Sequence, residues 1–347
     1  MARHLKSLYS RRKVRKRMRM GVISALIIIT VFIGIRYAHR LFGRDQDQAA
    51  AASANNNIKE QTNAPAVVVP KPTRRPVPEP KLSKIILEPT SKPNPKVADF
   101  INQATELING KPARIIEARD GLNETLSMPM NNVQRTVIKQ KLSGLADEWL
   151  FSRSIFPRDR LCSRYKVVSG NLLSSIGKEH KVPWEILMKV NKISRPELLK
   201  AGETIKVIHG PFHVRVYRST FKMDLYLQHT FVRSFNVGIG RPGRETPTGL
   251  WRVKRGGKMI SPKWTDPDTH KTYTAKDRDY PLGSRWIALE GISGEAQGRR
   301  GFAIHGTKIP EEIGIAGSRG CIRLYNVDAI LVYSLLKQGL SQVEVVD

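Results

Sequence analysis

The sequence predicts a multidomain protein with an N-terminal transmembrane helix, a small α-helical module, a βααβ domain and a mostly-β, sandwich-like C-terminal domain. Three observations support this prediction. An uncharged apolar run follows a basic N-terminus, a proline-rich stretch separates that run from the rest, and the hydrophobic period changes from helical to alternating near residue 212. With 347 residues, the chain is long enough for two or three small domains.

The net charge of the chain indicates an anionic partner. Lys and Arg number 59 against 30 acidic residues, which gives +29 at pH 7. Such an excess favours nucleic acid, acidic lipid head groups or a carboxylate-rich polymer. Because the basic residues are spread along the chain and form no nucleic-acid-binding motif, we expect no nucleic-acid partner.

The N-terminus predicts a membrane anchor. Residues 1–20 form a basic tail, and residues 21–38 begin with the uncharged run and form the expected transmembrane helix. The denser positive charge before the run keeps the tail cytoplasmic, so the protein is expected to be single-pass with its catalytic body on the periplasmic, extracytoplasmic side. A cleaved signal peptide is the alternative, because small residues follow at 49–54.

Two segments of different character follow the anchor. Residues 39–96 are rich in Ala, Asn and then Pro, which predicts a disordered tether that spans roughly 40 Å as a flexible coil. Residues 97–160 return to a helical period, with Pro112 expected to open the second helix. This module resembles a tetratricopeptide-like hairpin, and its role is either packing or partner binding.

Residues 163–209 predict a strand, two helices and a returning strand. Gly170 marks a turn, Asn171 is expected to cap the first helix, and Pro183 opens the second. The βααβ pattern resembles the LysM domain, a family that binds N-acetylglucosamine-containing glycans in a shallow groove. That resemblance implies a groove formed by the loops after the first strand and the second helix and lined by Gly170, Asn171, Leu172, Asn191 and Ile193. The alternative is a LysM fold kept only for packing.

The two cysteines carry different expectations. Two thiols make no disulfide framework, and we expect Cys162 to be buried and inert. Cys321 follows His305 by sixteen residues (321 − 305) and has an arginine two positions to either side, at 319 and 323. Positive charge lowers a thiol pKa, and a thiolate attacks carbonyl groups, so the sequence predicts a cysteine acyltransferase.

Residues 211–347 alternate like short strands, with Gly and Pro at the turns, which predicts a β-sandwich or a small barrel. The segments Thr246–Gly249, Leu282–Ile287, His305–Thr307 and Ser318–Leu324 resemble the L,D-transpeptidase catalytic domain in order and spacing. The resemblance implies a peptidoglycan transpeptidase that forms a thioester with a tetrapeptide stem, releases D-alanine and makes a 3→3 cross-link. An L,D-carboxypeptidase, an enzyme that attaches an envelope protein to peptidoglycan, and a non-catalytic wall-binding scaffold are the alternatives.

The same resemblance assigns the site. Cys321 is the expected nucleophile, His305 the general base and acid, Gly306 the carbonyl that orients the imidazole, and Gly320 an oxyanion N–H donor. The expected substrate contacts are Ser318, Arg319 and Arg323. Arg319 stands where many relatives have histidine and is expected to hold the thiolate or a substrate carboxylate, while Arg323 is either a ligand contact or a structural ion-pair partner. No metal site and no cofactor are expected, because the histidines lack ligand spacing.

Overall fold

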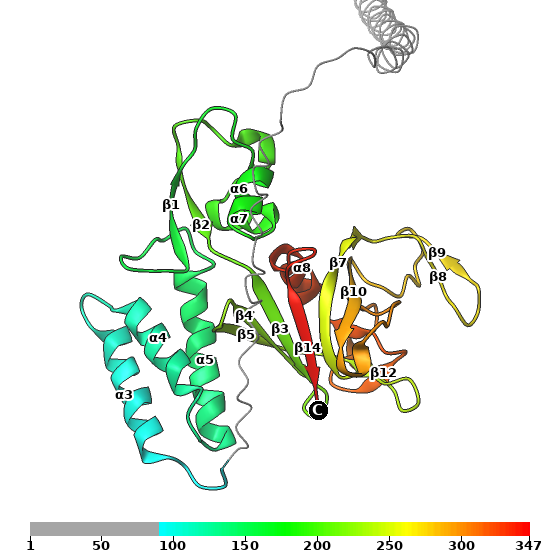
Figure 1. Ribbon diagram of the computed structural model, residues 1–347, viewed down its shortest axis with the longest axis horizontal. Helices are drawn as coiled ribbons and strands as arrows, with labels where there is room; N and C mark the ends of the chain where they lie inside the picture. The colour runs from blue at the N-terminus through cyan, green and yellow to red at the C-terminus, as the bar shows by residue number, and fades with distance from the viewer. Residues whose placement is uncertain (1–89) are drawn as a thin grey trace, which may run out of the picture. The chain divides into compact units, whose positions relative to one another are not determined.

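The computed structural model describes residues 90–347 (Figure 1). The basic tail, the predicted anchor and almost all of the predicted tether lie outside the described residues. Within residues 90–347, no helix combines the length and apolar character that crossing a membrane requires.

Three helices form the first module: α3 (Pro95–Asn109), α4 (Ile115–Thr125) and α5 (Asn132–Trp149). Asn94 and Asn131 each accept a backbone N–H at a helix start, and this explains why α3 and α5 begin where they do. The second helix starts at Ile115, so the expectation that Pro112 opens it was wrong; Arg114 occupies the N-cap position without a side-chain cap.

The βααβ domain consists of β1 (Cys162–Lys166), α6 (Leu173–Glu179), α7 (Trp184–Asn191), the short helix η1 (Pro196–Leu198) and β2 (Thr204–Ile208). Its two strands pair antiparallel. Asn171 does not cap α6, because Leu172 occupies that position. The Asn171 Oδ1 instead accepts the Val168 N–H and the Tyr165 O–H, each at 3.1 Å, and thereby closes the turn after β1.

One eight-stranded sheet dominates the C-terminal domain, in the order β13-β11-β10-β7-β14-β3-β4-β5. Figure 1 shows β14 between β3 and β7. The strands are β3 (Phe212–Tyr217), β4 (Lys222–Leu227), β5 (Thr230–Asn236), β7 (Gly249–Ile260), β10 (Arg285–Ser293), β11 (Ala303–Gly306), β13 (Ile322–Leu324) and β14 (Gln342–Val346). Two register shifts between β7 and β10 help to bend this sheet. The domain is therefore mostly β, as predicted. Its sheet is barrel-like, so of the two expected architectures the small barrel is found and the sandwich is not.

Smaller elements complete the domain. They are the parallel pair β6 (Ile239–Gly240) and β12 (Ala316–Ser318), the hairpin β8 (Trp264–Thr265) and β9 (Thr272–Tyr273), the short helices η2 (Gly294–Ala296) and η3 (Pro310–Glu312), and α8 (Asn326–Leu335). Helix α8 packs against β10 and β11, so its N-terminus lies beside the strand that carries His305.

The helical module and the βααβ domain both contact the barrel-like domain. Helix α5 lies on β5, where Lys139 pairs with the buried Asp224 at 2.5 Å, and Asn123 accepts the Phe231 N–H at 2.9 Å. The second contact satisfies a backbone donor on the edge strand of the sheet. The βααβ domain contacts the barrel-like domain through Lys337, whose Nζ donates to the Val182 carbonyl at 3.0 Å.

Candidate active site

Two adjacent parallel strands bring the candidate nucleophile and base together. The register of β11 with β13 pairs Ile304 with Ile322 and His305 with Arg323. Cys321 directly precedes β13 and therefore lies across from Ala303. Because side chains alternate along a strand, the Cys321 and His305 side chains project from the same face of the sheet. The Cys321 Sγ lies 4.0 Å from the Gly301 carbonyl, next to the start of β11.

A backbone carbonyl orients the His305 imidazole. The Nδ1–H of this buried ring donates to the Gly306 carbonyl at 2.6 Å. A carbonyl can only accept, so this contact selects the tautomer in which Nε2 keeps its lone pair. Burial lowers the pKa of His305 to about 4. The imidazole is therefore neutral near pH 7 and can accept a proton through Nε2.

The Cys321 thiol has a raised pKa, which corrects the expectation from the sequence. Burial of the thiol is the main cause, and the Ala303 backbone and the Arg323 charge only partly oppose it. Both flanking arginines face carboxylates, Arg319 those of Asp266 and Asp268 and Arg323 that of Glu312. The resting pair is consequently a protonated thiol beside a neutral imidazole, and the thiol needs a base when it attacks.

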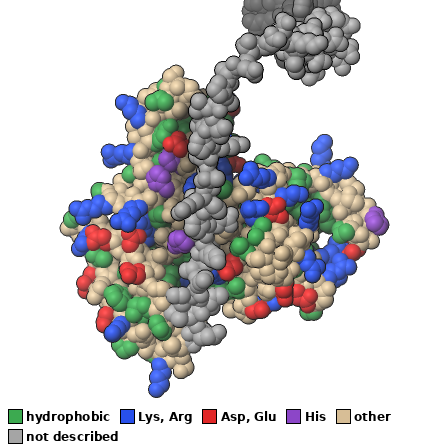
Figure 2. Space-filling model, in the orientation of Figure 1, with side chains coloured by type: hydrophobic (Ala, Val, Ile, Leu, Met, Phe, Trp, Pro, Cys, Tyr) green, Lys and Arg blue, Asp and Glu red, His purple; other side chains and the backbone are tan. Residues whose placement is uncertain are grey.

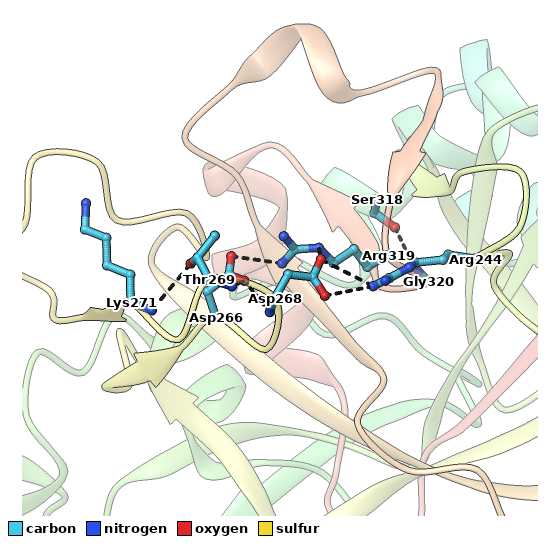
Figure 3. A network of polar contacts seen from close by, with 8 residues as sticks. All are labelled: Arg244, Asp266, Asp268, Thr269, Lys271, Ser318, Arg319 and Gly320. Carbon is cyan, nitrogen blue, oxygen red and sulfur yellow. Dashed lines mark hydrogen bonds and ion pairs between the residues drawn. The ribbon is translucent and has the colours of Figure 1, made fainter.

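Arg319 binds the β8–β9 hairpin loop, as Figure 3 shows. Its Nη1 lies 2.9 Å from Asp266 Oδ2, and its Nε lies 2.9 Å from Asp268 Oδ2. Arg244 also pairs with Asp268, at 3.3 Å. The Arg319 guanidinium lowers the pKa of Asp266 to about 2. Arg319 therefore fixes the hairpin loop beside the nucleophile, and its expected contact with the thiolate or a substrate carboxylate stays a prediction.

Ser318 and Gly320 shape the turn before the nucleophile. The buried Ser318 Oγ accepts the Gly320 N–H at 3.0 Å and donates to the Cys321 carbonyl at 2.6 Å. Ser318 is thus no substrate contact, and the Gly320 N–H is not free to act as an oxyanion donor; both expectations are corrected. Gly320 has φ +107°, and a Cβ there would lie 2.5 Å from Phe302, so only glycine fits this turn.

Two further contacts support the loops around the pair. The buried Thr246 Oγ1 donates to the Gly320 carbonyl at 2.9 Å, which joins the Thr246–Gly249 segment to the nucleophile turn. Arg323 Nη1 lies 2.6 Å from Glu312 Oε1, and the Thr307 hydroxyl donates to Glu312 Oε2 at 3.0 Å. Of the two interpretations of Arg323, the structure contains the ion pair.

Asn326, which the sequence analysis missed, joins three segments at the start of α8. Its Nδ2 donates to the Thr307 carbonyl at 2.9 Å, and its Oδ1 accepts the Ser284 N–H at 3.1 Å. A Cβ on either Gly283 or Gly306 would lie 2.1 Å from that Oδ1. Asn326 therefore packs directly against the peptide that orients His305. The only available signal was an asparagine shortly after the cysteine motif.

The βααβ domain places the expected groove residues differently. Gly170, Asn171, Leu172 and Ile193 are exposed or partly exposed residues on the two expected loops, and Leu172 is 63% exposed. Asn191 is buried. Its amide bonds to the Leu187 carbonyl and to the backbone N–H and carbonyl of Lys206. Asn191 therefore connects α7 to β2 and does not line the groove.

The remaining expectations concern Cys162, metals and surface charge. Cys162 is 2% exposed, and burial raises its pKa to about 12, as expected for an inert thiol. Within residues 90–347, no group of three or more His, Cys, Asp or Glu side chains could hold a metal ion. Figure 2 shows Lys and Arg scattered among acidic side chains on the visible face.

Comparison with known families agrees with these motifs. Residues 211–345 match the L,D-transpeptidase catalytic domain, and residues 165–207 match the LysM domain. The chain carries an L,D-transpeptidase catalytic domain preceded by a LysM domain.

Relatives of this L,D-transpeptidase include YkuD of Bacillus subtilis, which is 26% identical over 182 residues, covering 50% of this chain and 94% of YkuD. ErfK/SrfK of Escherichia coli K12 is 32% identical over 127 residues, which are 33% of this chain and 37% of that protein. Both carry L,D-transpeptidase names. A solved L,D-transpeptidase structure from Mycobacterium tuberculosis has 16% identity and a TM-score of 0.32, with coverage of 42% of this chain and 62% of that one.

Proposed function

We propose that this enzyme is a peptidoglycan L,D-transpeptidase that forms 3→3 cross-links through a thioester on Cys321. The observation that carries the proposal is the pairing of β11 with β13. This pairing places Cys321 and His305 on one face of adjacent strands, within a domain of the L,D-transpeptidase family. The donor is the stem tetrapeptide, cleaved after its meso-diaminopimelate residue.

The first half-reaction acylates the cysteine. His305 Nε2 takes the proton from the Cys321 thiol as Sγ bonds to the diaminopimelate carbonyl carbon. The Cys321 backbone N–H, which takes the place of the Gly320 N–H, donates to the resulting oxyanion. Losing such a donor costs roughly 10²–10³ in rate. The C–N bond then breaks, His305 returns its proton to the leaving amine, and D-alanine departs from the thioester.

The second half-reaction transfers the acyl group. An amine of a second stem attacks the thioester carbonyl, and His305 accepts the proton that this amine loses. The C–S bond breaks, and the thiolate recovers a proton from the imidazolium. One amide bond has been exchanged for another, and the cysteine and histidine have returned to their starting protonation states.

Incubation of the protein with purified tetrapeptide muropeptides, followed by mass spectrometry, tests this function. The expected product is a dimer lighter than two monomers by one alanine. The control is Cys321→Ala, which is expected to yield no product while keeping its fold. A tripeptide monomer alone would make the enzyme an L,D-carboxypeptidase, and a stem joined to an envelope protein would make it an attachment enzyme. Retained wall binding with an inert Cys321 would leave only a scaffold.

We also propose that the LysM domain binds N-acetylglucosamine glycan through the loops that carry Gly170, Asn171, Leu172 and Ile193. The exposed Leu172 side chain offers an apolar surface to a sugar ring. Glycan binding raises the local concentration of stems around the catalytic domain. Pull-down with insoluble peptidoglycan tests this, and Leu172→Asp is expected to weaken binding. Equal retention of both proteins would contradict it.

The proposed location follows from the sequence alone. Residues 21–38 are proposed to anchor the protein in the membrane with the catalytic body on the extracytoplasmic side. Membrane fractionation combined with protease accessibility tests this proposal. Recovery of a shortened, freely released protein would instead indicate cleavage of a signal peptide.

A further inference from the structure

The His305 imidazole stacks on an indole ring. Trp286 of β10 lies directly opposite His305 of β11 in the antiparallel register. The two ring centroids are 5.5 Å apart, and the ring planes differ by 19°. Trp286 is only partly buried, in contrast to the fully buried Trp251 of the core. Its indole therefore covers one face of the candidate base and is not simply a core side chain.

Together, two contacts fix the orientation of the imidazole. The Nδ1–H bond to the Gly306 carbonyl fixes one ring edge, and the stacked indole fixes the ring plane. The remaining nitrogen, Nε2, then has one defined direction. A displacement of a catalytic group by about 1 Å can slow a reaction roughly 10²-fold. An imidazole held in one orientation avoids that loss of rate.

Catalysis also requires the imidazole to become charged, and its surroundings oppose this. Burial and the Arg323 charge both disfavour imidazolium, while backbone hydrogen bonds to Gly306 and Leu282 favour it. Among the described residues, no carboxylate hydrogen-bonds to His305. The indole face attracts cations within about 6 Å, and tryptophan does so more strongly than the other aromatic residues. This attraction acts on the charged ring only, so it strengthens as the proton leaves the thiol.

We propose that Trp286 is a positioning residue for His305 that also stabilises the imidazolium formed during acyl transfer. In doing so it takes over the stabilising role that a carboxylate plays in other nucleophile–histidine arrangements. This inference rests on the proposed function, because it assigns Trp286 a part in the same proton transfers. In the first half-reaction the proton passes from Sγ to Nε2 and on to the leaving amine. In the second, the proton that the acceptor amine loses returns through Nε2 to Sγ.

Fluorinated tryptophans at position 286 test the charge stabilisation without changing shape or burial. Stepwise fluorination weakens the π-face, so the NMR-measured pKa of His305 is expected to fall by roughly one pH unit across the series. His213, another buried histidine with a pKa lowered to about 4, is the internal reference and is expected to stay constant. A His305 pKa that does not respond to fluorination would overturn the proposal.

Kinetics of the same proteins test the catalytic consequence. We expect kcat for acylation of Cys321 by the tetrapeptide to fall roughly tenfold across the series with KM unchanged. Trp286→Leu is expected to lose more activity than Trp286→Phe, which keeps an aromatic face. Unchanged kcat would contradict the inference. If the tetrapeptide does not acylate Cys321 at all, the proposed function fails, yet the His305 titration still decides the role of Trp286.

Discussion

Asn326 offers the sharpest test of how the site is held together. Asn326→Ala removes two hydrogen bonds and leaves the Thr307 carbonyl and the Ser284 N–H without these partners. A hydrogen bond is worth about 0.5–1.5 kcal/mol net, and an abandoned buried group costs about 1–3 kcal/mol. Because Thr307 is buried and Ser284 is partly exposed, we expect the free energy of unfolding to fall by roughly 2–4 kcal/mol.

Activity is expected to fall further than stability alone explains. The Gly306 peptide packs against the Asn326 amide, so its carbonyl shifts and His305 loses orientation. Thermal unfolding measures the loss of stability, and the rate of Cys321 acylation in the folded variant measures the loss of activity. We expect acylation to be 10–100-fold slower. Asn102→Ala, on the exposed surface of α3, is the control. A variant with unchanged melting temperature and rate would refute this account of Asn326.

Three further predictions concern protonation. The first uses a Cys162→Ser background, in which only Cys321 can react with iodoacetamide. Because the pKa of Cys321 is raised, its alkylation rate should increase about tenfold per pH unit up to at least pH 8.5. A rate that is already constant at neutral pH would indicate a resting thiolate. Arg319→Gln should raise the pKa of Asp266 from about 2 toward the usual range, as seen by carboxyl NMR; an unmoved pKa would contradict the pairing. The pKa of His305 is lower in the folded state than in the unfolded state, so the unfolded state binds more protons between pH 6.5 and 4. The free energy of unfolding should therefore decrease by up to about 3 kcal/mol as the pH falls through that window. His305→Gln should flatten this part of the stability curve, and an equally steep curve would count against it.

Local patterns in the sequence were enough to predict that a LysM domain precedes an L,D-transpeptidase catalytic domain. The βααβ pattern and the cysteine motif are short, contiguous and rich in turn glycines, so they identify their folds directly. They do not identify partners that are distant in the chain. Asp266 lies 53 residues from Arg319, and no local feature indicates that the two meet. An exposed arginine beside a cysteine therefore appeared available when it was already paired.

The other expectations that the structure corrects depend on burial, which the sequence does not reveal. Asn191 occupies a plausible groove position in sequence, but the fold turns its amide inward toward Lys206. The thiol pKa was predicted from neighbouring charges, while desolvation, which depends on tertiary packing, is the larger influence. No local feature of the sequence singles out Trp286, and only the pairing of β10 with β11 shows that its indole covers the imidazole.

Intact-protein mass spectrometry after mixing with a tetrapeptide stem detects the proposed thioester itself. We expect a covalent adduct of the tripeptide acyl group on Cys321, with release of D-alanine, and no adduct in Cys321→Ala or His305→Ala. An adduct on another residue, or D-alanine release that persists without Cys321, would contradict it.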